Sequence, residues 1–234
     1  MHDNFSAALR LTKPALASER GIVVAQHRRA AEAGAAVLAR GGDAVDAAIA
    51  TSFALGVVEP WMSGVGGGGA MVLWRAREQR ATVIDFGMRA PASLDLRDYP
   101  LSGRGVASDL FPWAHVVEDR NIVGPLSVAV PGTVDGMRVA YERFATLPWA
   151  ELLAPAVTLA EEGLLVDWFA TENIASAAAD LRRDPASAAA FLVDGLPPAP
   201  AWSARTQLRL PQGNLARTLE RLASAGARDF YDGA

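Results

Sequence analysis

The chain has 234 residues, a formal net charge of -4 at pH 7, 51% hydrophobic residues and 21% charged residues. A chain of this length and composition buries a substantial core, which excludes global disorder, and its scattered arginines with a single lysine offer no basic patch for nucleic acid. The lack of cysteine excludes disulfides and cysteine-ligated metals, and His2, His27 and His115 are too far apart for a ligand cluster, so we expect no cofactor and no metal.

The start of the sequence contains an early acid, Asp3, and no apolar run long enough for a signal-peptide core. We expect residues 1–20 to form a flexible N-terminal arm ahead of one continuous region, 21–234. No apolar run approaches the roughly 20 residues of a membrane span, so the sequence as written predicts a cytoplasmic protein without such a span. A leader upstream of the chain would instead predict a periplasmic location.

The first predicted elements are a short strand at 21–25 and a helix at 27–40, in which Ala, Val and Leu recur at helical spacing. His27 stands at the start of this helix. We interpret it as a polar helix-starting residue in preference to a catalytic acid or base.

A helix boundary follows at Gly41-Gly42, because glycine suits the left-handed cap that ends a helix. Asp43 then offers an N-cap oxygen to a second helix. That helix is almost all Ala, Ile, Val, Leu and Phe up to Glu59-Pro60, so we expect it to be buried on several sides.

A glycine loop at 63–69 leads from this helix into an apolar run. Gly64, Gly66 and Gly69 match the spacing G-x-G-x-x-G, but a helix precedes the loop and a strand follows it, which is the reverse of a dinucleotide-binding turn. We therefore interpret the glycines as a place where one backbone passes close to another. Ser63 lacks the G-x-S-x-G context of a nucleophile.

Two strands at 71–77 and 81–86 are predicted to form a hairpin, and an irregular connection rich in Pro, Gly, Asp and Ser follows at 94–128. Packing is the commoner role for apolar and aromatic side chains in such a connection. Our hypothesis is that one side of a cleft is lined by Asp85, Arg89, Trp113 and His115.

The second half of the chain is predicted to be mainly helical. A strand at 128–130 precedes a helix that begins near Thr133, which we interpret as a cap in preference to a nucleophile, and ends near Phe144. Further elements are expected in the following order: a helix from 149 that stops at Gly163, a helix at 168–183, a Pro-rich surface segment at 194–200, and a helix at 215–225 capped by Asn214.

Several words of the sequence come in a specific order: GGDAVDAA, VVEP, SGVGGGGAMVLW, VAVPGTVDG, LPWAELLAPAVTLAEEG and FYDG. Together they closely resemble the large-subunit region of the gamma-glutamyltransferase family. The resemblance implies an α+β fold, the αββα four-layer sandwich of N-terminal-nucleophile hydrolases, of which this chain is the large-subunit part only. It also implies a precursor that cuts itself and exposes an N-terminal Thr on a small subunit as the nucleophile.

Position 87 departs from the family pattern. In typical transferases the matching word runs Asp-Phe-Arg-Glu, and its Arg grips the α-carboxylate of the glutamyl substrate. Here Gly87 takes that place, and Arg89 follows two residues later. Residues two apart on an extended segment point to the same side, so Arg89 is either a substrate-binding residue or half of a structural salt bridge.

The resemblance assigns no catalytic residue to this chain, because no plausible nucleophilic Thr is present, and we expect the chain alone to be inactive. The expected partners are a small subunit with an N-terminal Thr and a small γ-glutamyl or related amide substrate. We also expect an exposed apolar surface where the small subunit belongs. Two alternatives stay open: an acylase of the same fold that acts on a non-glutamyl amide, and a non-catalytic truncated large-subunit fragment.

Overall fold

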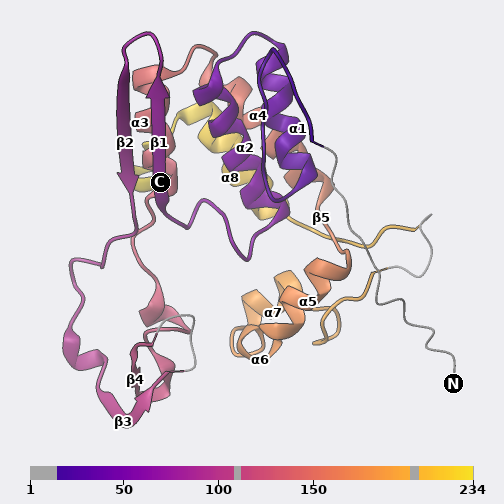
Figure 1. Cartoon of the computed structure of the whole chain (residues 1–234). Coiled ribbons are helices and arrows are strands. Elements are labelled where there is room, and N and C mark those ends of the chain that lie inside the picture. The colour runs from indigo at the N-terminus through magenta and orange to yellow at the C-terminus, as the bar shows by residue number, and fades with distance from the viewer. Residues whose placement is uncertain (1–14, 108–111, 201–205, 234) are drawn as a thin grey trace, which may run out of the picture.

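The computed structural model describes residues 15–107, 112–200 and 206–233 (Figure 1). Most of the predicted N-terminal arm, 1–14, lies outside the described residues. The rest of it, 15–20, is exposed and forms neither a helix nor a strand. None of the helices in the described part of the chain is both long enough and apolar enough to cross a membrane.

A body of packed helices holds the main core (Figure 1). Its central helix, α2, packs against α1 and α4, and α4 packs in turn against α8. The fully buried side chains at these contacts are large and aliphatic, as in Ile49 and Leu152. The helices of this body are α1 (Arg28–Ala39), α2 (Ala44–Val58), α3 (Thr133–Phe144), α4 (Trp149–Glu162), α8 (Gly213–Ala225) and the short α9 (Asp229–Asp232).

The predicted helix boundaries in the first half are confirmed because they depend on local capping. The imidazole Nδ1 of His27 accepts a hydrogen bond from the Arg29 amide at 3.1 Å, so His27 is the N-cap of α1. Gly41 has φ +93 at the end of α1. Asp43 caps α2, and Asp46 completes a reciprocal capping box with it.

The predicted hairpin is also confirmed. It consists of β1 (Gly69–Arg75) and β2 (Arg80–Phe86), which pair in antiparallel register. Its inner face packs against the helical body through Met71, Leu73, Ile84 and Phe86. Its outer face is apolar yet exposed: the exposed fractions are 76% for Val72, 57% for Trp74 and 62% for Val83.

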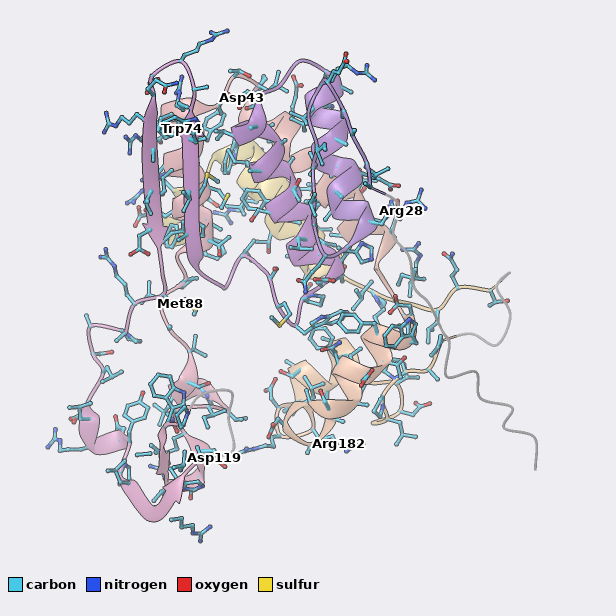
Figure 2. The ribbon with its side chains drawn as sticks, in the orientation of Figure 1. Arg28, Asp43, Trp74, Met88, Asp119 and Arg182 are labelled. Carbon is cyan, nitrogen blue, oxygen red and sulfur yellow. The ribbon has the colours of Figure 1, made fainter. Side chains whose placement is uncertain are left out.

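The connection at 94–128 contains more regular structure than the sequence predicted. It forms a lobe that extends away from the body beyond Met88 (Figure 2). In it β3 (Leu101–Val106) pairs with β4 (Ala114–Val116), and short helical turns flank the pair. The sequence conceals β3 because its residues, LSGRGV, are largely polar or glycine and lack alternation. The turns are η1 (Leu96–Asp98), η2 (Val117–Asp119) and η3 (Pro125–Ser127).

A second, smaller core lies beside the body, around α5 (Trp168–Ser176), α6 (Ala178–Leu181) and α7 (Pro185–Phe191). The single helix predicted at 168–183 is therefore interrupted, at Ala177. The sequence analysis missed α7, although Asp184-Pro185 is a sound N-cap and first-turn pair. The strands β5 (Leu164–Leu165) and β6 (Arg209–Leu210) join this core to the body.

Three further expectations need correction. Residues 21–25 do not form a strand, because they pair with no strand of the described residues, although Val23 packs against the main core and Val24 is 87% exposed. The strand predicted at 128–130 is reduced to one bridge through Val130. Helix α8 begins two residues earlier than predicted, at Gly213 with Gln212 as its N-cap, so Asn214 is not the cap.

The sheets of the described residues are three antiparallel pairs, β1–β2, β3–β4 and β5–β6. The glycine loop from Gly64 to Gly69 leads into strand β1, as predicted, and not into a helix.

Candidate functional site

Arg89 lies on an extended segment just beyond β2 and is joined to the segment that opens α3. The Arg89 amide donates to the Val130 carbonyl at 3.3 Å, and the Val130 amide donates to the Arg89 carbonyl at 2.8 Å. This bridge, the Arg89–Val130 bridge, brings together two stretches that are 41 residues apart in the chain. It fixes the backbone of Arg89 relative to α3.

The glycine loop contacts the segment that opens α3, and together with the two segments of the Arg89–Val130 bridge it forms a three-way junction. The Gly67 carbonyl accepts hydrogen bonds from the amides of Gly132 at 2.8 Å and Thr133 at 3.1 Å. These amides belong to the uncapped first turn of α3, because the N-cap is Gly132, which has no side chain to offer. Thr133 is thus the first residue of the helix and not its cap, which corrects that expectation.

Close approach of backbones, predicted for the glycine loop, is confirmed at Gly68 and extends to the start of α3. A Cβ on Gly68 would lie 2.8 Å from both the Met88 amide nitrogen and the Phe86 carbonyl oxygen. A Cβ on Gly132 would lie 2.0 Å from the Phe86 oxygen, and one on Gly136 would lie 2.2 Å from the Phe86 ring. A Cβ at Gly68 or Gly132 would require the backbone to shift, and one at Gly136 would require the Phe86 side chain to shift.

Tyr231, on α9, binds the segment that opens α3 through two hydrogen bonds. Its hydroxyl accepts a hydrogen bond from the Asp135 amide at 3.0 Å and donates one to the Pro131 carbonyl at 3.1 Å. Burial raises the pKa of the Tyr231 hydroxyl above its ordinary value, which keeps the hydroxyl protonated and able to donate. Arg221 holds α9 in place through a charge-assisted hydrogen bond to Asp229 at 2.8 Å.

A pocket of about 410 Å³ opens beside this junction. Most of its charged side chains are already engaged: Asp135 pairs with Arg138 at 2.8 Å, and Arg228 pairs with Asp232. Arg89 differs, since its guanidinium makes neither an ion pair nor a hydrogen bond with any described residue. The pocket is lined by Ile84, Asp85, Phe86, Gly87, Arg89, Val130, Pro131, Gly132, Asp135, Gly136, Val139, Arg228, Tyr231 and Asp232.

The predicted cleft of four residues is half wrong. Asp85 and Arg89 line the pocket, whereas Trp113 and His115 belong to the lobe and do not line it. His115 instead ties the lobe together: its Nδ1 lies 2.7 Å from the Ser102 hydroxyl, and its Nε2 lies 3.4 Å from a carboxylate oxygen of Asp119, a residue labelled in Figure 2. These contacts link β3, β4 and the turn that follows.

The sequence analysis noted the words that contain Gly132, Gly136 and Tyr231 but did not predict that they meet. The available signal was the pair of glycines at i and i+4 in PGTVDG, which places both on one face of the helix start. Nothing in the local sequence indicated which element packs against that face.

The sequence profile of the family described as gamma-glutamyltranspeptidase matches residues 30–234. Among curated relatives, the acylase ACY 1 proenzyme of Pseudomonas sp. (strain V22) is 41% identical over 222 residues, which is 94% of this chain and 38% of that protein. The glutathione hydrolase proenzyme of Bacillus subtilis (strain 168) is 37% identical, over 91% of this chain and 34% of that protein. This chain therefore spans less than two fifths of the length of these relatives.

Solved structures agree with these matches. The crystal structure of Helicobacter pylori gamma-glutamyltranspeptidase superposes with a TM-score of 0.79 at 29% identity, covering 94% of this chain and 58% of that one. Cephalosporin acylase from Bacillus halodurans superposes with a TM-score of 0.75 at 28% identity, covering 100% of this chain and 41% of that one. The expected α+β fold of N-terminal-nucleophile hydrolases, here in part, is confirmed. On the combined strength of profile, sequence and structure, the chain belongs to the gamma-glutamyltranspeptidase family.

Proposed function

We propose that this chain is the large-subunit portion of an amide hydrolase or acyltransferase. In this proposal the N-terminal Thr of a separate small subunit attacks the substrate amide, and its own α-amine acts as the base. The acyl-enzyme then passes a γ-glutamyl or similar carboxylate-bearing acyl group to water or to an amine. Membership of an enzyme family supports the reaction type.

The observation that carries the proposal is the guanidinium of Arg89, which lies at the pocket and has no ion-pair or hydrogen-bond partner among the described residues. A planar guanidinium makes two parallel charge-assisted hydrogen bonds to a carboxylate, which gives both strength and orientation. The other arginine that lines the pocket, Arg228, is neutralised by Asp232. Arg89 is therefore our candidate for the residue that binds the substrate carboxylate.

Gly87 supports a substrate preference that differs from that of typical transferases. Its φ lies outside the left-handed region, and a Cβ there would meet a carboxylate oxygen of Asp85 at 3.3 Å, a contact that a small shift relieves. The fold therefore does not require glycine at this position. Arg89, two residues further along, takes over the role in our proposal, with its cation displaced along the segment.

A second candidate function is the hydrolysis of a non-glutamyl amide. Two relatives carry the name acylase ACY 1 proenzyme, at 41% and 39% identity over 94% of this chain. Together with Gly87, these relatives favour an acylase-like substrate that still bears a carboxylate for Arg89.

The small subunit is expected on the outer face of the β1–β2 hairpin. Val72, Trp74 and Val83 leave this face apolar and exposed, as expected for a surface that another sheet covers. The side chains of alternate residues 81, 83 and 85 share one face of β2. In our proposal Arg89, beyond the end of β2, lies on the side that the small subunit covers, so that the subunit brings its nucleophile beside Arg89.

The main test uses the complete enzyme, produced from a coding region that joins this chain to its small subunit. Arg89→Ala is expected to lower kcat/KM for a carboxylate-bearing amide by roughly 30-fold to 900-fold, or about 2–4 kcal/mol, as loss of a charge-assisted pair does. Arg89→Lys should recover part of this loss, since an ammonium keeps the charge but not the two-pronged geometry. Arg80→Ala, at the exposed start of β2, is the matched control and should leave kcat/KM unchanged.

Substrate pairs sharpen this test. An amide whose carboxylate is replaced by a neutral group should be a poor substrate of the parent enzyme, yet lose little further with Arg89→Ala. If Arg89→Ala lowers thermal stability but leaves kcat/KM and this preference intact, Arg89 is structural and the carboxylate site lies elsewhere.

Gly87→Arg separates the two candidate functions. If Gly87 sets an acylase-like preference, the substitution should raise the ratio of kcat/KM for a γ-glutamyl amide over a non-glutamyl amide by about tenfold, the worth of one added charge-assisted bond. An unchanged ratio would show that position 87 does not control the acyl group.

The 234-residue chain by itself is expected not to hydrolyse γ-glutamyl-p-nitroanilide, because the proposed nucleophile belongs to the small subunit. Turnover above a heat-killed control that survives repurification would refute this part of the proposal.

A further inference from the structure

Tyr231 connects the C-terminal helix α9 to the backbone that carries Arg89. One hydroxyl group engages both sides of the turn that opens α3, at Pro131 and at Asp135. The residue before Pro131 is Val130, whose amide and carbonyl both bond to Arg89. Pro131, whose carbonyl Tyr231 binds, is thus covalently bonded to Val130, the residue that forms the bridge to Arg89.

The bonds of Tyr231 replace a cap that the sequence does not supply. The N-cap of α3 is Gly132, so the first-turn amides need partners from elsewhere. The Gly67 carbonyl serves the amides of Gly132 and Thr133, and Tyr231 serves that of Asp135. Removing the hydroxyl leaves the Asp135 amide without this partner and frees the Pro131 carbonyl.

We propose that Tyr231 is a positioning residue, which holds the 130–135 turn and thereby fixes the backbone of Arg89 at the pocket. The effect on catalysis rests on the proposed function of Arg89. The effect on the backbone does not, and this allows the two to be tested separately.

The first experiment measures amide hydrogen exchange of the 234-residue chain. In Tyr231→Phe the amides of Arg89 and Val130 should exchange about tenfold faster, as expected when one supporting hydrogen bond is lost from a local opening reaction. The matched control is Tyr141→Phe. The Tyr141 hydroxyl accepts a hydrogen bond from the Trp149 amide at 3.2 Å, at the start of another helix. Its loss should leave the amides of Arg89 and Val130 unchanged.

A second variant keeps the hydroxyl and loosens its support. Asp229→Asn removes the charge that pairs α9 with Arg221, so it should accelerate exchange at Arg89 in the same direction but by a smaller factor. Unchanged exchange of the Arg89 amide in a folded Tyr231→Phe chain overturns the proposal. If Tyr231→Phe fails to fold, an unchanged Arg89 amide in Asp229→Asn overturns it equally.

The second experiment follows catalysis in the complete enzyme. Tyr231→Phe should raise KM for a carboxylate-bearing amide about tenfold while changing kcat/KM for the matched neutral amide much less. In an Arg89→Ala background the same substitution should no longer alter this preference, because neighbours that act together are not additive. Equal losses for both amides, in either background, would show that Tyr231 supports folding alone.

Failure of the positioning role of Tyr231 and failure of the proposed function of Arg89 give different results. Faster exchange at Arg89 with no effect of Arg89→Ala on substrate preference would contradict the proposed function and uphold the positioning role. Unchanged exchange at Arg89 in Tyr231→Phe, together with a large effect of Arg89→Ala on substrate preference, would contradict the positioning role and uphold the proposed function.

Discussion

The junction beside Arg89 and the lobe at 94–128 both contain glycines, but for opposite physical reasons. At the junction, Gly132 and Gly136 are needed because a Cβ would collide with Phe86. In the lobe, Gly103 has φ +73 and Gly105 has φ +87, and a Cβ at either would meet no described atom within 4 Å. Glycine is thus required at the junction by close contact with Phe86, and in the lobe by the left-handed backbone.

Hydrogen-bonded aspartates also differ between the helical body and the lobe. In the body, the side chain of Asp46 is fully buried and accepts hydrogen bonds from the amides of Asp43, Thr146 and Leu147 at 2.8, 3.0 and 3.2 Å. In the lobe, Asp95 pairs with Arg97 at the exposed surface. Water can replace the exposed bonds between Asp95 and Arg97 but not the buried bonds of Asp46. Only the bonds of Asp46 should therefore matter for stability.

The largest expected effect is at the junction. Gly132→Ala places a methyl group 2.0 Å from the Phe86 carbonyl oxygen, and the backbone must shift to relieve the clash. We expect a loss of at least about 3 kcal/mol in the free energy of unfolding, measured by urea denaturation.

Gly64→Ala is the matched control, because it lies in the same glycine loop but a Cβ there meets no described atom within 4 Å. Its change should stay within about 0.5 kcal/mol. Equal effects of Gly132→Ala and Gly64→Ala would contradict the distinction between crowded and open glycines.

A somewhat smaller effect is expected for Asp46→Asn, at about 2–3 kcal/mol, because an amide cannot accept all the hydrogen bonds that the carboxylate accepts. Burial by itself raises the pKa of Asp46, but hydrogen bonds from Thr146, Asp43 and Leu147 outweigh it and hold the pKa below its ordinary value. The ionised carboxylate therefore contributes stability that is fully present above the unfolded pKa of about 3.9 and is lost as pH falls through the lower folded pKa.

Urea denaturation at several pH values checks this sign. The stability difference between the parent and Asp46→Asn should be constant from pH 7 to about pH 5 and shrink at lower pH. Asp95→Asn, in the lobe, should leave the denaturation midpoint unchanged at every pH. A difference for Asp46 that grew on acidification would show that the carboxyl is protonated in the folded protein.

At Gly103 in the lobe we expect a smaller effect than at Gly132 or Asp46. Gly103→Ala meets open space, so its cost is the left-handed backbone alone, about 1 kcal/mol. Hydrogen exchange should show the change at the amides of β3 and β4 and leave those of α2 untouched. A global loss as large as that of Gly132→Ala would mean that the lobe and the body unfold as one unit.

Sequence patterns predicted the elements whose signals are local. Asp43 and Gly41 mark the boundaries of α2 and α1 because a cap depends on residues within one turn. The hairpin was predictable from two apolar runs around a short turn, and the ordered words identified the family and so the fold. Arg89 was selected by its place in one of these words, and its substrate role stays a prediction.

Tertiary structure alone decided what surrounds Arg89. Tyr231 bonds to Pro131 across 100 residues, and Val130 bridges to Arg89 across 41, although neither partner has a spacing that indicates the other. The same holds for Trp113 and His115, which the sequence placed near Arg89 and the fold placed in the lobe. Local periodicity and capping determine where a helix or strand forms, whereas the packing of whole elements determines which distant residues meet.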